Sequence, residues 1–226
     1  MSMSRSYKWL GGIGYILLMI PFVNLVGYIL VGIAWIMAGT DVKQGLFKAT
    51  GIIMIITMVL SGVMIALFFP TITYLMSGLP FGEPSSFVPP RMFEEFFGAI
   101  GLFLILGAVM AVLGLIEWIL ELVSHFRAAS VYNVKWFRRA GWMRIITVII
   151  AIIVIAALIF LAFSTSFFTS FFTEPSGIFN LYTYMLALII PGLLGLISII
   201  FSAISFFSIP EIERESQRWY PPPPPP

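Results

Sequence analysis

The chain has 226 residues, of which 60% are apolar and only 10% are charged, and its formal net charge is +2. Soluble domains carry about 25% charged residues, so this composition excludes a soluble globular protein and indicates one that folds in lipid. The basic residues are spread over short loops, which favours a role in membrane orientation and excludes a nucleic-acid-binding surface. Because the chain has no cysteine, it forms no disulfide and no thiolate metal site.

The first apolar run is too long for one straight crossing. Between Lys8 and Asp41 lie 32 uncharged residues, which as one helix would measure roughly 48 Å against a hydrocarbon core of about 30 Å. Pro21 lies near the middle and favours a bend, since proline removes a helical hydrogen bond. We therefore expect a short or re-entrant helical hairpin with helices at Tyr7–Ile20 and Asn24–Thr40.

Four further apolar segments are long enough to cross a bilayer, which takes about 20 residues each. They are Ala49–Phe69, Phe96–Ile116, Ile145–Phe168 and Leu181–Phe207. The stretch Thr71–Phe93 is rich in proline and glycine, so we expect a loop there and a helix end at Pro70. Pro191 is expected to kink the last helix. None of these segments contains a charged residue.

Parts of the sequence recur at an offset of about 90 residues. Residues 47–51 (Phe-Lys-Ala-Thr-Gly) align with residues 137–141 (Phe-Arg-Arg-Ala-Gly), and Glu-Pro-Ser at 83–85 recurs at 174–176. A weaker copy of the aromatic-basic start opens the chain at 7–11. We therefore predict an all-α, polytopic transmembrane helical bundle of three tandem hairpins. The hairpins cover about 7–40, 47–125 and 137–210, and a charged, proline-rich cytoplasmic tail follows at 211–226.

The distribution of basic residues favours the same topology. Short cytoplasmic loops are enriched in Lys and Arg, and all basic segments lie on one side only if the first run crosses twice or dips back. This predicts six crossings of the plasma membrane with both termini in the cytoplasm. The residues expected to orient the chain are also candidates for binding anionic lipid head groups: Lys8, Lys48, Lys135, Arg138, Arg139 and Arg144.

Glu117, Glu121 and His125 form the most concentrated polar group in the sequence. Their spacing of four places them along one helical face. One hypothesis is a metal or proton-relay site. The interpretation we favour is the solvated end of a span with a Glu121–His125 pair, since metal sites usually take three or four protein ligands. The other acidic pair, Glu94 and Glu95, is predicted on the opposite side of the membrane.

No pattern in the sequence indicates an enzyme. A cysteine nucleophile is absent, the single histidine has no neighbouring aspartate, and neither a phosphate-binding glycine loop nor a Gly-x-Ser-x-Gly elbow occurs. We therefore expect no catalytic, cofactor or metal residues. Uncharged spans also argue against proton-coupled transport. Ser198, Ser202 and Ser205 either line a groove or serve helix packing, and we favour packing.

These observations favour a non-enzymatic scaffold or accessory subunit of a membrane complex. The alternatives are a passive transporter or channel for a small neutral or lipid-like molecule, and an interfacial lipid-modifying enzyme that uses the Glu117 group. The expected partners are the bilayer, anionic lipids and a cytoplasmic protein. That protein would dock on a polyproline II segment formed by Pro221, Pro222, Pro223, Pro224, Pro225 and Pro226.

Three short motifs resemble a known family. The Gly-Gly-Ile-Gly opening at 11–14, the segment Val-Lys-Trp-Phe-Arg-Arg-Ala-Gly at 134–141, and Phe-Phe-Ser-Ile-Pro-Glu at 206–211 resemble the largely archaeal membrane family called domain of unknown function 996. The resemblance covers nearly the whole chain except the proline tail. It implies a prokaryotic integral membrane protein and carries no biochemical activity.

Overall fold

The computed structural model describes residues 6–78, 90–164 and 176–211, and every regular element in them is a helix. The helices are α1 (Ser6–Leu18), α2 (Asn24–Asp41), α3 (Gly45–Gly78), α4 (Pro90–Val131), α5 (Lys135–Ser164) and α7 (Ser176–Phe207). Five of them, all except α1, contain a stretch long and apolar enough to cross a membrane. The predicted all-α, multi-pass membrane character is therefore confirmed. The Glu-Pro-Ser copies, apart from Ser176 at the start of α7, and Pro221–Pro226 lie outside the described residues.

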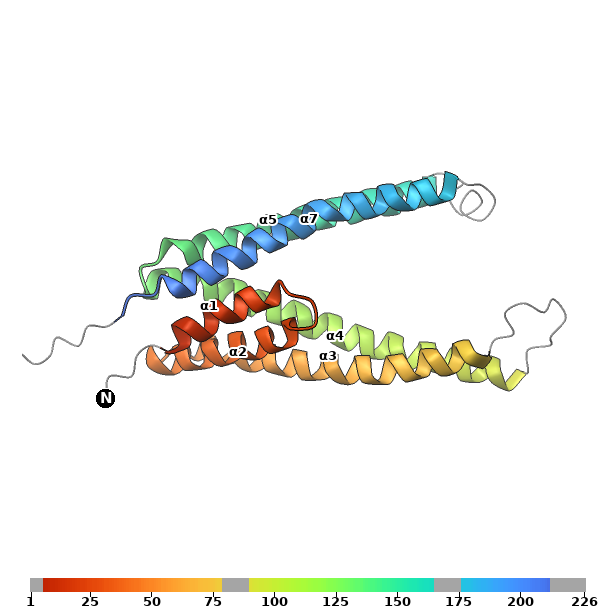
Figure 1. Ribbon diagram of the computed structural model, residues 1–226, viewed down its shortest axis with the longest axis horizontal. Helices are drawn as coiled ribbons and strands as arrows, with labels where there is room; N and C mark the ends of the chain where they lie inside the picture. Colours follow the sequence, from red (N-terminus) through yellow and green to blue (C-terminus); the bar gives the residue numbers. More distant parts are fainter. Residues whose placement is uncertain (1–5, 79–89, 165–175, 212–226) are drawn as a thin grey trace, which may run out of the picture.

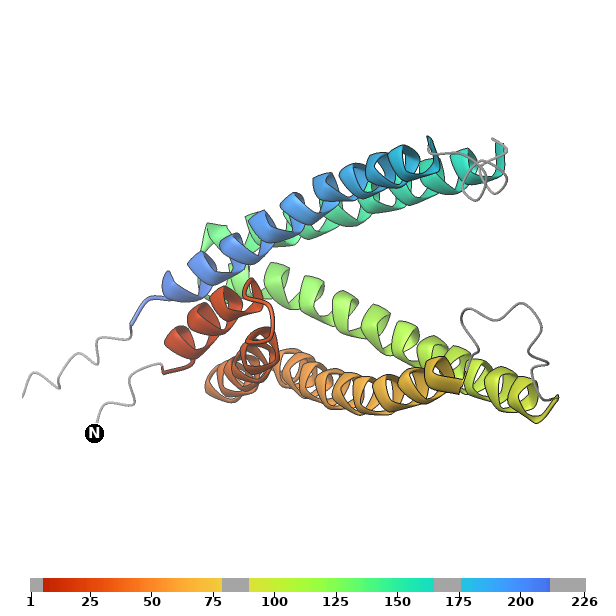
Figure 2. The same ribbon diagram turned by 45° about the vertical axis from the view of Figure 1, so that its right-hand side comes forward.

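Two long helix pairs meet at one end of the molecule and diverge toward the other (Figures 1 and 2). We call the pair α3 and α4 the first arm, and the pair α5 and α7 the second arm. Helix α4 contacts α5 near the turn that joins them, while α2 packs on α3 and α1 packs on both α2 and α7. The two N-terminal helices thus link the arms at the end where these meet, which we call the closed end.

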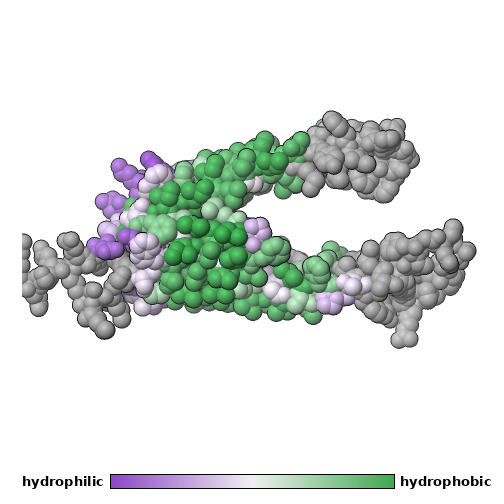
Figure 3. Space-filling view, in the orientation of Figure 1, coloured by the Kyte–Doolittle hydropathy of each residue, from purple (hydrophilic) through white to green (hydrophobic). Residues whose placement is uncertain are grey.

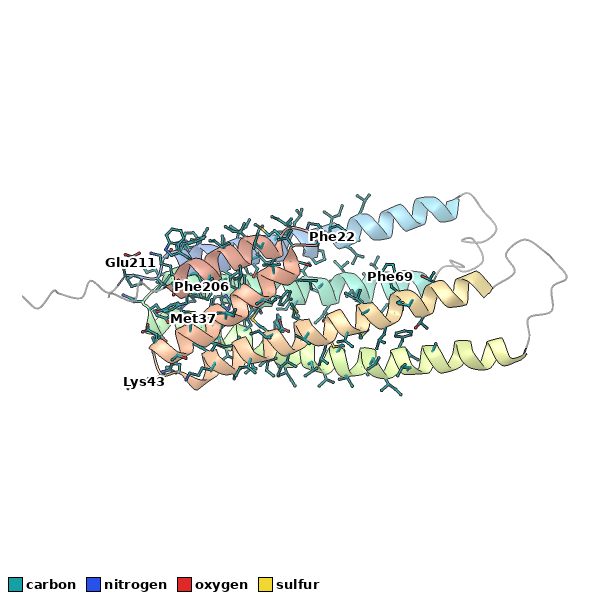
Figure 4. All side chains as sticks on the ribbon, turned by 60° about the horizontal axis from the view of Figure 1, so that its bottom comes forward. Phe22, Met37, Lys43, Phe69, Phe206 and Glu211 are labelled. Atoms are coloured by element: carbon teal, nitrogen blue, oxygen red, sulfur yellow. The ribbon has the colours of Figure 1, made fainter. Side chains whose placement is uncertain are left out.

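Helices α1 and α2 agree with the expected bounds to within two residues. The chain reverses between them at residues 19–23, where Phe22 adopts a positive φ of 66°. Helix α1 has 13 residues, which makes it about 20 Å long and too short to cross a core of about 30 Å. In Figure 4 Phe22 lies partway along the molecule, and Lys43 and Glu211 lie at its closed end.

The long helices extend well beyond the predicted spans. Helix α3 continues through Pro70 to Gly78, and α4 begins at Pro90 instead of Phe96. The expected helix end at Pro70 was wrong, because a proline inside a transmembrane helix is tolerated where neighbouring groups satisfy the freed carbonyl. Proline also suits the first turn of a helix, where its missing amide has no partner to lose.

A core of aromatic rings fills the closed end. The ring of Trp35 on α2 has its centroid 5.1 Å from Phe47 on α3, 6.1 Å from Phe137 on α5 and 5.1 Å from Phe206 on α7. Tyr15 on α1 lies 5.7 Å from Phe206. All five rings are fully buried. Contacts of this kind add about 0.5–1.5 kcal/mol each beyond area burial, so this core holds the helices together.

Glycine allows the closest backbone contact at the closed end. A Cβ on Gly51 of α3 would lie 2.2 Å from the carbonyl oxygen of Gly32 on α2, so the two backbones touch. In the arms, by contrast, a Cβ on Gly62, Gly107 or Gly114 meets nothing within 4 Å. Apolar surface covers the arms, and the most hydrophilic residues gather at the closed end (Figure 3). The glycine-mediated backbone contacts between helices therefore lie at the closed end.

Candidate functional site

Acidic and basic side chains are buried beside the aromatic core. Glu117 and Glu121 are only 7% and 6% exposed, and His125 is 0% exposed. The expectation of a solvated helix end was wrong. Helix α4 continues past these residues to Val131, and helices from both sides cover them, which residue spacing along one helix does not reveal. We call Tyr15, Glu117, Glu121, His125, Arg144 and Ser202 the buried polar cluster.

An ion pair between α4 and α5 lies at the centre of the buried polar cluster. Arg144 Nη1 donates to Glu121 Oε2 at 2.7 Å, and Arg144 Nη2 donates to Glu121 Oε1 at 2.6 Å. The Tyr15 hydroxyl of α1 donates to Glu121 Oε1 at 2.5 Å, and Trp35 Nε1 of α2 donates to the Tyr15 oxygen at 3.2 Å. A two-pronged, charge-assisted pair of this kind is the arrangement that best offsets the cost of burying two charges.

Arg144 differs from the other predicted orientation residues. Its side chain is mostly buried and faces Glu121, so it does not lie among the exposed residues that contact head groups. Lys48, Lys135 and Arg138 are exposed at the closed end. Arg139 is also exposed, and its guanidinium carbon lies 4.4 Å from the centroid of the Trp136 ring.

Lys8 joins the two ends of the described chain. Its Nζ lies 3.6 Å from Glu211 Oε1, just beyond α7, and the rings of Trp9 and Phe207 lie 5.5 Å apart. The start of α1 and the end of α7 therefore lie side by side. This places both ends of the described chain at the closed end, together with the exposed basic residues.

His125 connects α4 to α7. Its Nδ1 lies 2.8 Å from the backbone oxygen of Glu121, and its Nε2 lies 3.0 Å from Ser202 Oγ. Because a carbonyl oxygen only accepts, Nδ1 carries a hydrogen. The Ser202 hydroxyl also lies 2.9 Å from the Ser198 carbonyl, so it donates either to that carbonyl or to Nε2. His125 therefore contacts the backbone oxygen of Glu121 and not the carboxylate, which the predicted Glu121–His125 pair would require. The Glu121 carboxylate binds Arg144.

Hydroxyl groups extend the polar contacts to α3. Thr50 Oγ1 lies 2.7 Å from Ser124 Oγ, next to His125 on α4. The buried polar groups thus connect all six described helices, through Tyr15, Trp35, Thr50, Glu121, Arg144 and Ser202. Sequence reasoning missed Tyr15, Trp35, Thr50 and Ser124, because aromatic and hydroxyl residues are common in membrane helices and only their partners distinguish them.

The three serines of α7 lie in helix contacts. Ser198, Ser202 and Ser205 are buried. The Ser205 hydroxyl donates to the Phe201 carbonyl of its own helix, and the Ser202 hydroxyl lies 2.9 Å from the Ser198 carbonyl. The Ser198 hydroxyl lies 3.4 Å from the Ala140 carbonyl of α5. The packing interpretation of these serines is confirmed.

The arrangement offers few ligands for a metal ion. Among the residues that the structure describes, no three His, Asp or Glu side chains come close enough together to hold one. The interactions that the structure shows at the buried polar cluster are hydrogen bonds and one ion pair.

The fold and the buried polar cluster define a class: a multi-pass, all-α membrane protein whose helices are joined by an internal ion pair. Comparisons add nothing to this class, since no family model, no curated protein and no solved structure matches the chain. The resemblance to domain of unknown function 996 stays a prediction.

Proposed function

We propose that this protein is a non-enzymatic scaffold or accessory subunit of a membrane complex. In this proposal its closed end is a rigid joint, and its two arms present apolar surfaces to other membrane proteins. The observation that carries the proposal is the contrast between these parts: the ion pair at the closed end is satisfied within the chain, whereas the arms are largely uncovered.

The arms expose more apolar surface than the closed end does. Leu104 on α4 and Ile152 on α5 are 69% and 61% exposed. The most apolar stretches of α3, α4 and α5 bury almost none of their residues within the chain. In a bilayer, lipid tails or the helices of another protein cover such surfaces. Small residues such as Gly107 and Gly114 favour contact with the helices of another protein over contact with lipid tails, because they permit close approach of two helix backbones.

We place the chain in the plasma membrane as three tandem hairpins with cytoplasmic termini. In the predicted six-crossing arrangement the first hairpin is the re-entrant one, because α1 is too short for a full crossing. Backbone geometry supports the tandem arrangement. Lys43 and Asn133, 90 residues apart, both have φ of 53°, and the residues before them make equivalent helix-ending hydrogen bonds. Val42 N donates to Ala38 O at 3.1 Å, and Tyr132 N donates to Ala128 O at 2.9 Å.

Two further contacts belong to the proposal. Anionic lipid head groups would bind the exposed Lys48, Lys135, Arg138 and Arg139, whose charges gather at the closed end. A cytoplasmic protein would dock on Pro221–Pro226, since a polyproline segment presents a preformed, extended ligand.

Photo-crosslinking in native membranes tests the scaffold function. A photoreactive amino acid replaces Leu104 or Ile152, one on each arm, and in a control chain it replaces the exposed Ser130 at the closed end. We expect protein adducts of discrete mass from at least one arm position and a different adduct pattern from Ser130. Adducts to lipid alone at both arm positions would contradict the proposal.

A further inference from the structure

Glu117 is the carboxylate of the buried polar cluster that has no cationic partner. It lies one helical turn from Glu121 on α4, within the apolar stretch Gly101–Val131, and is 7% exposed. Within the described residues, ion pairs join Arg144 to Glu121 and Lys8 to Glu211, and neither involves Glu117. Both Nη groups of Arg144 are bound to Glu121, and its Nε makes no hydrogen bond there.

The groups near enough to act on the charge of Glu117 come from four helices. They are Tyr28 on α2, Thr57 on α3, Glu121 on α4 and Arg144 on α5. A phenol and a hydroxyl are neutral at neutral pH, so the formal charges here are two carboxylates and one guanidinium. If both carboxylates were ionised, one negative charge would be buried without compensation.

Thr57 marks the position of a missing hydrogen-bond partner. Its Oγ1 is buried and has no hydrogen-bond partner of good geometry within the described residues. It lies near the Glu117 carboxyl, to which its O–H could also donate if that carboxyl were ionised. A protonated carboxyl has an O–H that a threonine oxygen accepts, while its second oxygen can still accept from the same hydroxyl group. The pair therefore has the groups needed to hold a proton.

Energetics favour the neutral carboxyl. Burying an ionised carboxylate without a partner costs several kcal/mol, and in proteins such a group takes up a proton instead. We propose that the Glu117 carboxyl is a proton-binding site that holds one proton at neutral pH and releases it in alkali. A proton fits this site better than a metal ion, because the described residues place only two carboxylates here and both oxygens of Glu121 already accept hydrogen bonds.

The site gives the joint between the arms a charge that depends on pH. Protonated, the buried polar cluster is neutral, with Arg144 balancing Glu121. Deprotonated, it carries one extra negative charge between α2, α3 and α4. This goes beyond a scaffold function, and it holds whether or not the arms bind another protein.

Infrared difference spectroscopy of the protein in lipid nanodiscs tests the proposal. A step from neutral to alkaline pH is expected to remove a carbonyl-stretch band of a protonated carboxyl, with an amplitude of one group per chain. The band is expected to be absent in Glu117→Gln. It is expected to persist in the control Glu211→Gln, since the Glu211 side chain is exposed.

Thr57→Val provides a second, milder test. This variant keeps the Glu117 carboxyl and removes the hydroxyl beside it, so the band is expected to remain and to shift in frequency. No protonated-carboxyl band at neutral pH in the native protein, or a band unchanged in Glu117→Gln, would overturn the proposal. A band that is lost in Glu117→Gln but does not move in Thr57→Val would keep the proton on Glu117 and would overturn only the contact with the Thr57 hydroxyl.

Discussion

Glu121 and Arg144 depend on each other for their tolerance in the apolar interior. The carboxylate receives both Nη groups of Arg144 and the Tyr15 hydroxyl, and together these leave neither of its oxygens unpaired. In a low-dielectric environment, loss of one partner leaves the other as an uncompensated charge, which costs more than the intact pair contributes.

Arg144→Met is therefore expected to lower the free energy of unfolding by about 3–5 kcal/mol, the loss typical of breaking a buried ion pair. Methionine is chosen as the replacement because Met54, which lies 90 residues earlier and so aligns with Arg144 in the predicted repeat, is buried. The measurement is equilibrium unfolding in mixed micelles. The exposed Arg138 provides the control: Arg138→Met is expected to change the stability by less than about 0.5 kcal/mol. Equal losses in the two variants would contradict the buried pair.

At the scale of elements, apolar length predicted the number of long helices correctly but misplaced their ends. An apolar segment ends where its side chains no longer face lipid, whereas a helix continues for as long as its backbone amides and carbonyls have hydrogen-bond partners. Helix α5 begins at Lys135, ten residues before the predicted membrane span at Ile145 and two residues before the predicted start of the third hairpin at 137. Charged residues such as Glu121 and Arg144 end an apolar run without ending a helix, because an opposite charge on the adjacent helix pairs with them.

Contact between α2 and α3 depends on glycine. Gly51→Ala is expected to lower the stability by about 1–3 kcal/mol, the usual cost of overpacking, because its Cβ would lie 2.2 Å from the Gly32 carbonyl oxygen. Gly62→Ala in the same helix is the matched control, with nothing within 4 Å of the new Cβ. It is expected to be neutral or to stabilise by up to about 1 kcal/mol through helix propensity. Thermal unfolding in detergent compares the two, and a loss only in Gly62→Ala would be the contrary result.

At the scale of the whole molecule, both ends of the described chain and the turn between α4 and α5 lie at the closed end. The Lys8–Glu211 ion pair ties α1 to the end of α7. Because the basic residues gather there, the short-loop charge rule predicts that this end faces the cytoplasm.

Single-cysteine labelling tests that orientation directly, since the chain contains no cysteine. Ser6→Cys and Asn133→Cys introduce thiols at exposed positions of the closed end. A membrane-impermeant maleimide is expected to label neither variant in intact cells and both after permeabilisation. Labelling of one variant from outside and the other only from inside would rule out the shared cytoplasmic face.

The candidate site could be predicted in part. The helical face of Glu117, Glu121 and His125 follows from their spacing. The pairing with Arg144 follows only from the observed helix ends: Glu121 precedes the end of α4 by about as many residues as Arg144 follows the start of α5. Two helices that leave one short turn bring such positions opposite each other. The predicted spans ended at Ile116 and began at Ile145, so both residues lay outside them. The Tyr15 and Ser202 contacts were out of reach, because they join helices far apart in the chain.

The sequence by itself determined that this protein is helical, lies in a membrane and crosses it several times, because the cost of exposing backbone polar groups to lipid leaves a long apolar chain few other folds. It also determined which loops are basic. Only the tertiary structure decided that Glu117, Glu121 and His125 are buried, because whether a polar helix face meets water or another helix depends on how the helices pack. That packing brings Arg144 to Glu121 and, among the described residues, leaves Glu117 without an ion pair of its own.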